Sequence, residues 1–246
     1  MTSKKFKSNK ATFEIKGNKI NKKYFKTGDS QAEYELLLAI KKRFTPKYVD
    51  DWTYRPIKVY SAGNDETIIM EYIPAKTIKD HFRGQANPSY YKHMGIWLGF
   101  LHVQSINREY NTVLSFEDYS DSNFLLDFKN KVGVAIDPGI SDSLYEHPSI
   151  SLITGLFSIQ RTVLKESKNY FIVLKAAKFF LKGYKKSSKT LDFPDIKRGV
   201  KALSKRKKVL WYKNRGRHLP IYKKIGRTIE VVSVAILFKV ISMSIS

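Results

Sequence analysis

The stretch that decides the fold runs Asp118-Tyr119-Ser120-Asp121-Ser122-Asn123-Phe124-Leu125-Leu126-Asp127, and Val134-Ala135-Ile136-Asp137-Pro138-Gly139 follows a few residues later. Its two apolar runs, 124–127 and 132–136, are typical of short strands joined by a turn at Lys129-Asn130-Lys131. Asn123 stands five positions after Asp118, and Asp137 stands 14 after Asn123. A hairpin between them brings all three polar side chains to one edge.

Phosphoryl transfer from ATP needs parts of this kind. One carboxylate orients the attacking hydroxyl and accepts its proton, while an amide and a second carboxylate hold Mg²⁺ against the phosphates. The spacing therefore makes Asp118 the candidate catalytic base, with Asn123 and Asp137 as candidate Mg²⁺ ligands. The competing interpretation is structural, with all three as turn residues, since Asp-Pro-Gly is itself a favoured turn sequence.

These motifs resemble those of the protein-kinase-like superfamily, in which the catalytic loop reads Asp, four residues, Asn, and an Asp-Phe-Gly follows. Here Pro138 stands in the middle of the second motif. The loop is most similar to those of small atypical kinases, namely RIO-type kinases, aminoglycoside phosphotransferases and bacterial lipopolysaccharide-core sugar kinases. The resemblance covers about residues 11–140.

The resemblance extends to the segment Met70-Glu71-Tyr72-Ile73-Pro74, which looks like the strand and hinge that hold adenine in these families. It implies that backbone groups of Glu71 and Ile73 meet the base, with Met70 behind it. The segment from Trp97 to His102 resembles the end of the helix that precedes the catalytic loop in these families. We expect His102 to pack in the core or make a local hydrogen bond. We expect Asp121 to cap or position the loop rather than to catalyse.

The resemblance also implies a strand lysine paired with a helix glutamate. Glu33 is the expected glutamate, with Glu35 as its rival. Lys22 lies 11 residues before Glu33 and is the preferred lysine; Lys23 and then Lys26 are the alternatives. Glu33 also has a structural interpretation, as the partner of Ser30 in a helix capping box.

Some family features are absent. Many members have a histidine shortly before the catalytic aspartate, whereas here Phe116-Glu117 precedes Asp118. The glycine-rich signature is missing, because Lys16-Gly17-Asn18-Lys19 is a plain turn. No Ala-Pro-Glu follows Gly139. These departures argue against a eukaryotic-type protein kinase and favour a small-molecule, glycan or lipid kinase.

The remaining pattern predicts an α+β, two-lobed kinase-like fold. Residues 1–74 should form an N-lobe with a small antiparallel sheet (strands over 11–27, 56–60 and 67–72) and one helix over 30–44. Residues 75–196 should form a mostly helical C-lobe carrying the catalytic loop. Periodicity predicts helices over 78–83, 88–103, 149–164, 167–183, 195–212 and 219–243.

Charge sets the C-terminal segment, 197–246, apart. The chain of 246 residues carries 45 Lys+Arg against 22 Asp+Glu, a net charge of +23, and 13 of these cations lie within 197–227, which holds no Asp or Glu. Trp211, Tyr212 and Tyr222 interleave with them, and a mostly apolar run follows from Ile229. This pattern favours docking on an anionic membrane surface, with nucleic acid as the main alternative partner.

Composition excludes several function classes. With no cysteine, the chain has no disulfide framework, thiolate metal site or cysteine nucleophile. The polar N-terminus indicates no secretory signal, so we expect a cytoplasmic protein on the inner face of the cytoplasmic membrane. The leading expectation is an ATP- and Mg²⁺-dependent kinase that acts on a glycan or lipid-linked glycan. The resemblance to sugar kinases implies a place in lipopolysaccharide biosynthesis. The alternatives are a pseudokinase scaffold of the same fold and a basic RNA-binding protein.

Overall fold

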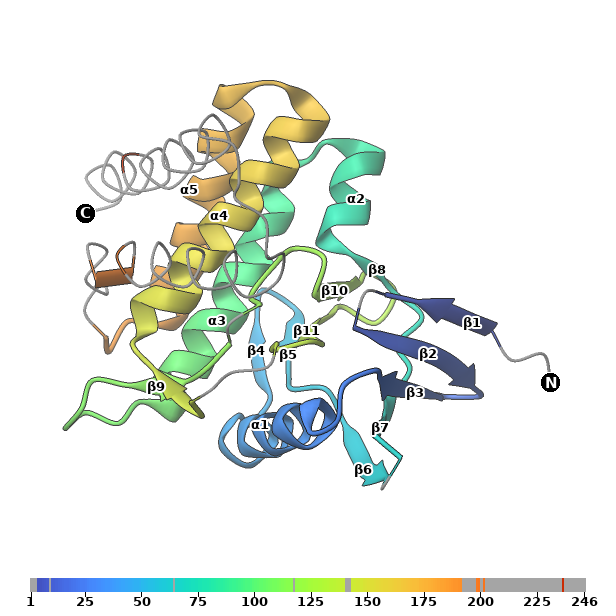
Figure 1. The fold of residues 1–246 in the computed structure, drawn as a ribbon. Coiled ribbons are helices and arrows are strands. Elements are labelled where there is room, and N and C mark those ends of the chain that lie inside the picture. Colours follow the sequence, from blue (N-terminus) through green and yellow to red (C-terminus); the bar gives the residue numbers. More distant parts are fainter. Residues whose placement is uncertain are drawn as a thin grey trace, which may run out of the picture.

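The fold was analysed in a computed structural model. It describes residues 4–8, 10–63, 65–116, 118–139, 143–191, 198–199, 201 and 236. Figure 1 shows a twisted sheet with one helix beside it, a bundle of longer helices on the other side of the molecule, and a second sheet between them. Among the described residues, no helix has the length and apolar content needed to cross a membrane.

The first sheet is fully antiparallel and uses the order β1-β2-β3-β7-β6. Gly17, with φ +60°, makes the tight turn between β2 and β3. Helix α1 packs on this sheet, and its buried residue Leu37 joins a cluster with Ile68, Met70 and Val134. The elements are β1 (Lys4–Lys7), β2 (Ala11–Lys16), β3 (Lys19–Tyr24), α1 (Asp29–Arg43), β6 (Val59–Gly63) and β7 (Thr67–Glu71).

The second sheet combines strands from distant parts of the chain in the order β4-β5-β11-β10-β8. Strands β10 and β11 form an antiparallel hairpin, and β5 pairs in parallel with β11 through Thr53 opposite Val132. This sheet carries the end of the hairpin, and so Asp137, toward the first sheet. Its elements are β4 (Lys47–Val49), β5 (Trp52–Tyr54), β8 (Lys76–Thr77), β10 (Phe124–Asp127) and β11 (Val132–Ala135).

The helical part is built on α3 and α5, whose backbones approach each other closely. A Cβ on Gly95 would lie 1.9 Å from the Phe180 carbonyl oxygen, and one on Gly183 would lie 2.2 Å from that of Lys92, so only glycine fits at either position. Two short strands, β9 and β12, pair just before the loop that leads to Asn123. The elements are α2 (Ile78–Gln85), the 3₁₀ turn Pro88–Tyr90, α3 (Tyr91–Ser105), β9 (Val113–Leu114), β12 (Tyr145–Glu146), α4 (Pro148–Ser167) and α5 (Tyr170–Ser187).

The predicted α+β, two-lobed architecture is confirmed, and the predicted hairpin strands over 124–127 and 132–136 correspond to β10 and β11. The predicted capping box of α1 is wrong: the helix begins after Gly28 without a side-chain cap, and the Ser30 hydroxyl donates to Glu66 at 2.6 Å. Glu33 is thereby left to interact with the sheet. The helices expected over 195–212 and 219–243 lie almost wholly outside the described residues.

Candidate functional site

Lys22 joins three elements of the fold through its ammonium group. It lies in β3 and donates to both carboxylate oxygens of Glu33 in α1, at 2.8 and 2.7 Å. The same nitrogen lies 3.1 Å from Asp137 Oδ2, which follows β11. The Lys22 and Glu33 side chains are 4% and 1% exposed, whereas Asp137 is 32% exposed. One buried cation therefore serves a buried carboxylate on one side and an accessible one on the other.

Two aromatic residues of the first sheet complete the surroundings of Lys22. Its ammonium lies 4.8 Å from the centre of the Tyr24 ring and 5.9 Å from that of Phe13. The Tyr24 hydroxyl also donates a hydrogen bond to Glu33. Tyr24 thus holds both members of the pair, which fixes the distance between β3 and α1.

The electrostatics of this group follow from one buried cation and two carboxylates. Burial raises the pKa of Glu33, Asp137 adds to the rise and Lys22 opposes it, giving a pKa of about 8. Burial alone would lower the pKa of Lys22, but Glu33 and Asp137 outweigh it and raise the pKa above its ordinary value. Lys22 is therefore cationic at neutral pH, and the raised pKa of Glu33 favours its protonated form over a wider pH range than for an exposed glutamate.

Asp118 packs directly against the loop that carries Asp137. Its amide donates to the Pro138 carbonyl at 3.1 Å, and a Cβ on Gly139 would lie only 3.0 Å from the Asp118 Cβ. Gly139 has φ +78°, a left-handed conformation that favours glycine. Burial, with the charge of Asp137, raises the pKa of Asp118 above its ordinary value. Such a carboxylate accepts a proton more readily than an exposed one.

Asn123 links the two loops. Its side-chain nitrogen donates to the backbone oxygens of Asp118, at 3.0 Å, and Asp137, at 3.4 Å, while the Ile136 amide donates to its backbone oxygen at 2.9 Å. Both side-chain contacts use the amide nitrogen, so the amide oxygen, at the other end of the group, is the atom that a cation would bind. The structure thus brings Asp118, Asn123 and Asp137 together at one edge of the hairpin.

The loop before Asn123 is anchored in the helical part by apolar packing and by one buried carboxylate. Phe116, two residues before Asp118, packs edge-on against Trp97, and the Tyr119 ring stacks on the same indole. Asp121 is 1% exposed and accepts hydrogen bonds from three hydroxyl groups. These come from Tyr91 in α3 (3.0 Å) and from Ser158 (2.9 Å) and Thr162 (3.2 Å) in α4. Asp121 is therefore a positioning residue.

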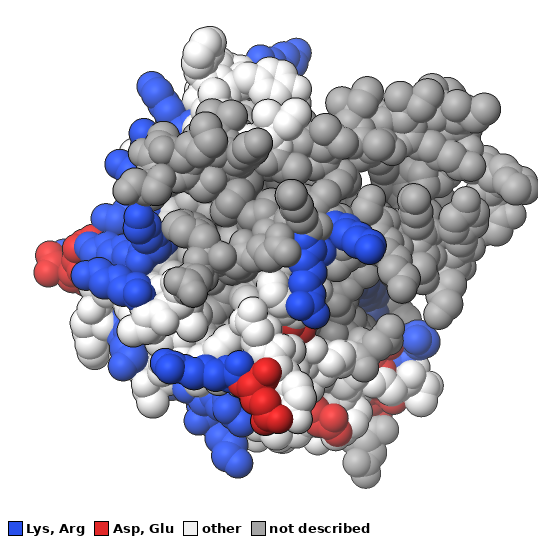
Figure 2. All heavy atoms as spheres, turned by 90° about the vertical axis from the view of Figure 1, so that its left-hand side faces the viewer, with Lys and Arg blue, Asp and Glu red and all other residues white. Residues whose placement is uncertain are grey.

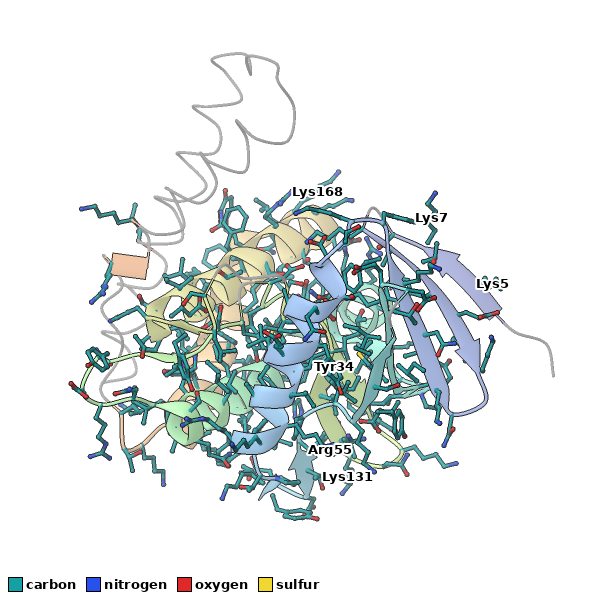
Figure 3. All side chains as sticks on the ribbon, turned by 60° about the horizontal axis from the view of Figure 1, so that its bottom comes forward. Lys5, Lys7, Tyr34, Arg55, Lys131 and Lys168 are labelled. Atoms are coloured by element: carbon teal, nitrogen blue, oxygen red, sulfur yellow. The ribbon has the colours of Figure 1, made fainter. Side chains whose placement is uncertain are left out.

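The hinge-like segment is fixed by an ion pair that sequence reasoning did not find. Arg55, labelled in Figure 3, holds the Glu71 carboxylate with two nitrogens, one of them at 2.9 Å, and the Lys58 amide donates to the same carboxylate at 2.6 Å. Trp97 donates to the Arg55 carbonyl at 2.9 Å, so the end of β7 is tied to α3. Met70 lies in the core at 4% exposure.

The structure separates the rival residues from the site. Lys23 is exposed and pairs with Asp65 at 3.2 Å, and Lys26 lies 3.6 Å from Asp29. Glu35 is exposed and accepts from Gln31. His102 is fully buried between the Tyr184 and Ser151 hydroxyls, and burial lowers its pKa to about 3. None of these four side chains contacts Lys22, Asp118 or Asp137 in the part of the chain that the structure describes.

The residues present suit a shared rather than a self-contained metal site. Among the described residues, no cluster of three or more His, Asp or Glu side chains is placed to hold a metal ion. Mg²⁺ commonly keeps one or two protein ligands and takes the others from substrate phosphates and water. Asn123 and Asp137, linked by the contact at 3.4 Å, fit that pattern.

Comparison with known proteins supports the fold. No family model and no curated protein sequence matches the chain. Among solved structures, a choline/ethanolamine kinase family protein from Mesorhizobium loti aligns over 97% of this chain and 88% of its own, with a TM-score of 0.57 and 10% identity. An ADP-bound aminoglycoside phosphotransferase aligns over 95% and 92%, with a TM-score of 0.55 and 13% identity. An aminoglycoside 3'-phosphotransferase of type VIII aligns over 78% and 88%, with a TM-score of 0.53 and 11% identity.

The element order and these alignments agree, and the chain therefore has the two-lobed kinase-like fold that these solved structures share.

Proposed function

We propose that the chain is an ATP- and Mg²⁺-dependent phosphotransferase that acts on a hydroxyl acceptor. The observation that carries the proposal is the contact of Lys22 with both Glu33 and Asp137. It brings together, from β3, α1 and the end of β11, the charged groups that phosphoryl transfer requires. A purely structural role for these residues does not account for an accessible carboxylate facing a buried ammonium.

The residues then take distinct roles. Lys22, held by Glu33 and Tyr24, binds the α- and β-phosphates of ATP. Asn123 and Asp137 hold Mg²⁺, which when bound neutralises charge on the phosphates. Asp118 accepts the acceptor's proton as the acceptor oxygen bonds to the γ-phosphorus and the bond from that phosphorus to the bridging oxygen breaks, releasing ADP. The raised pKa of Asp118 suits it to this step.

The segment 70–73 is proposed as the adenine site. The Glu71 amide donates to the Lys58 carbonyl at 2.9 Å, so in this proposal the base meets the Glu71 carbonyl oxygen and the Ile73 amide. The Glu71 side chain faces Arg55. Met70, buried beneath them, supplies an apolar wall.

For the acceptor, we propose a glycan or lipid-linked glycan at the cytoplasmic face of a membrane. Two observations support it: the likeness of the catalytic loop to those of lipopolysaccharide-core sugar kinases, and the 13 cations of residues 197–227, which suit an anionic surface. Nearly all of this segment lies outside the described residues. The solved structures with this fold include aminoglycoside phosphotransferases and a choline/ethanolamine kinase family protein, so aminoglycosides and amino alcohols belong among the acceptors tried.

The proposal is tested by incubating the purified protein with γ-labelled ATP and Mg²⁺ and with glycan, lipid, aminoglycoside and amino-alcohol fractions. We expect label in at least one fraction, and a loss of about a hundredfold or more in Asp118→Asn. Asp127→Asn, on the exposed end of the same hairpin, serves as control. Failure to label any fraction, or equal labelling by Asp118→Asn, would refute a transferase and favour a scaffold.

A further inference from the structure

The outer face of α5 carries a row of exposed lysines. Lys175, Lys178, Lys182 and Lys185, here called the lysine row, recur at intervals of three or four residues and so share one side of the helix. The helix contains no Asp or Glu. In Figure 2, Lys and Arg side chains gather along one edge of the view.

Three of the four lysines in the row have no neutralising carboxylate in the part of the protein that the structure describes. Other surface lysines pair with carboxylates, as Lys92 and Lys186 do with Asp50 at 2.7 and 2.6 Å. Across the described part of the chain, Lys175, Lys178 and Lys182 take part in no such ion pair. Three or more like charges in a line repel one another and weakly destabilise the helix unless an anionic partner approaches.

The opposite face of α5 fixes this row in place. Val173, Ala177 and Phe180 are at most 1% exposed, and the close approach of Gly183 to α3 leaves the helix little freedom to roll. The lysines therefore stand on a rigid, convex support and not on a flexible tail. A convex row of cations fits a broad anionic surface better than a small anionic ligand, which needs a concave site.

Two aromatic residues extend the row at the start of the helix. The Tyr170 and Phe171 side chains are 60% and 75% exposed. Lys168, labelled in Figure 3, lies two residues before the start of this helix. Exposed aromatic rings beside lysines are typical of surfaces that reach the boundary between lipid headgroups and acyl chains. Single-stranded nucleic acid is instead bound in a positively charged groove, where aromatic rings stack on successive bases.

We propose that α5 docks the protein peripherally on an anionic membrane surface, with the lysine row against the headgroups and Tyr170 and Phe171 at the interface. This inference rests on the described surface alone, and not on catalysis or on residues 197–246. Its failure and that of the proposed function are separable, because phosphate transfer to soluble aminoglycosides or amino alcohols is measured without a membrane.

The first test is sedimentation of the full chain with vesicles of phosphatidylcholine containing phosphatidylglycerol. The variant is the triple substitution Lys175→Gln, Lys178→Gln and Lys182→Gln. A lysine near such a surface contributes a factor of about five to binding, so we expect the variant to bind about a hundredfold more weakly. An undiminished affinity would overturn the proposal.

A matched triple removes the same charge elsewhere, through Lys41→Gln, Lys42→Gln and Lys129→Gln, which replace exposed lysines of α1 and the β10–β11 turn. Charges more than about 8 Å from the surface are screened at physiological salt, so this control should lose less than about fivefold. Equal losses in both triples would mean that only net charge matters and would overturn a specific role for α5. Thermal melting of both variants verifies that each is folded.

The second test uses the absence of cysteine from the chain. Phe171→Cys, labelled with an environment-sensitive fluorophore, should show increased and blue-shifted emission with anionic vesicles but not with single-stranded RNA. Lys42→Cys, labelled in the same way, should not respond. An unchanged signal at position 171, or a response to RNA and not to vesicles, would overturn the membrane assignment.

Discussion

The clearest physical prediction concerns the protonation of Glu33. Its carboxyl is 1% exposed, and burial together with Asp137 raises its pKa to about 8, against an ordinary value of 4.5. Between these two values the folded protein retains the Glu33 proton, whereas the unfolded chain has released it. Raising the pH through this window therefore lowers the free energy of unfolding.

The magnitude follows from the size of the window. Each pH unit inside it is worth about 1.4 kcal/mol for one group, so from pH 5 to pH 7.5 the wild type should lose up to about 3 kcal/mol relative to Glu33→Gln, which has no proton to release. Urea unfolding of both proteins across this range measures the difference. Comparing them cancels the contributions of groups that both proteins share.

Glu35→Gln is the matched control, because Glu35 lies two residues away on α1 but is exposed. We expect the wild type and Glu35→Gln to show the same dependence on pH. If wild type and Glu33→Gln also run parallel, Glu33 is ionised throughout this range, and the inference that burial and Asp137 raise its pKa is wrong.

Three further predictions follow from the loops and the core. Gly139→Ala should lower kcat at least tenfold, because the new Cβ would lie 3.0 Å from Asp118. Gly17→Ala is the control: Gly17 has a similar φ of +60°, but a Cβ there would have no atom within 4 Å. This control should lose only about 1–2 kcal/mol of unfolding free energy to backbone strain, measured by urea unfolding, and should keep its kcat. The pKa of His102 is lowered to about 3 from 6.5, so below pH 6.5 the unfolded chain binds a proton at His102 that the folded protein does not. The wild type should therefore lose about 3 kcal/mol of unfolding free energy between pH 7 and pH 4.5 relative to His102→Gln. Equal losses in the two proteins would show that the buried imidazole titrates in the folded protein. Asp121→Leu should lower the unfolding free energy by about 1–3 kcal/mol and should also lower kcat, since it leaves the hydroxyls of Tyr91, Ser158 and Thr162 without their acceptor. Unchanged values would show that the loop is held by its aromatic residues alone.

The hairpin with its three polar residues could be predicted from the sequence because its information is local. Turn residues, apolar runs and spacing within 22 residues place Asp118, Asn123 and Asp137 at one edge. Lys22 was preferred among three lysines from its spacing to Glu33, and β3 buries it because side chains alternate between the faces of a strand.

Long-range partners could not be predicted in the same way. Strand β5 pairs with β11 about 80 residues later, and no pattern in Trp52-Thr53-Tyr54 encodes a parallel partner at that distance. The capping prediction for Ser30 failed because Glu66, which is distant in sequence, competes for the same hydroxyl. Likewise, the pairing of Arg55 with Glu71 depends on how the connection between β5 and β6 lies beside the end of β7.

The central claim is that Lys22, Asn123 and Asp137 bind the phosphates of ATP with Mg²⁺ while Asp118 performs the proton transfer. Its most direct test is calorimetric titration of ATP with and without Mg²⁺ into the wild type, Asp137→Asn and Asp118→Asn. We predict Mg²⁺-dependent binding that Asp137→Asn weakens at least about tenfold and that Asp118→Asn retains, although the latter transfers phosphate about a hundredfold or more slowly. ATP that fails to bind, or that binds Asp137→Asn as tightly as the wild type, would contradict the account.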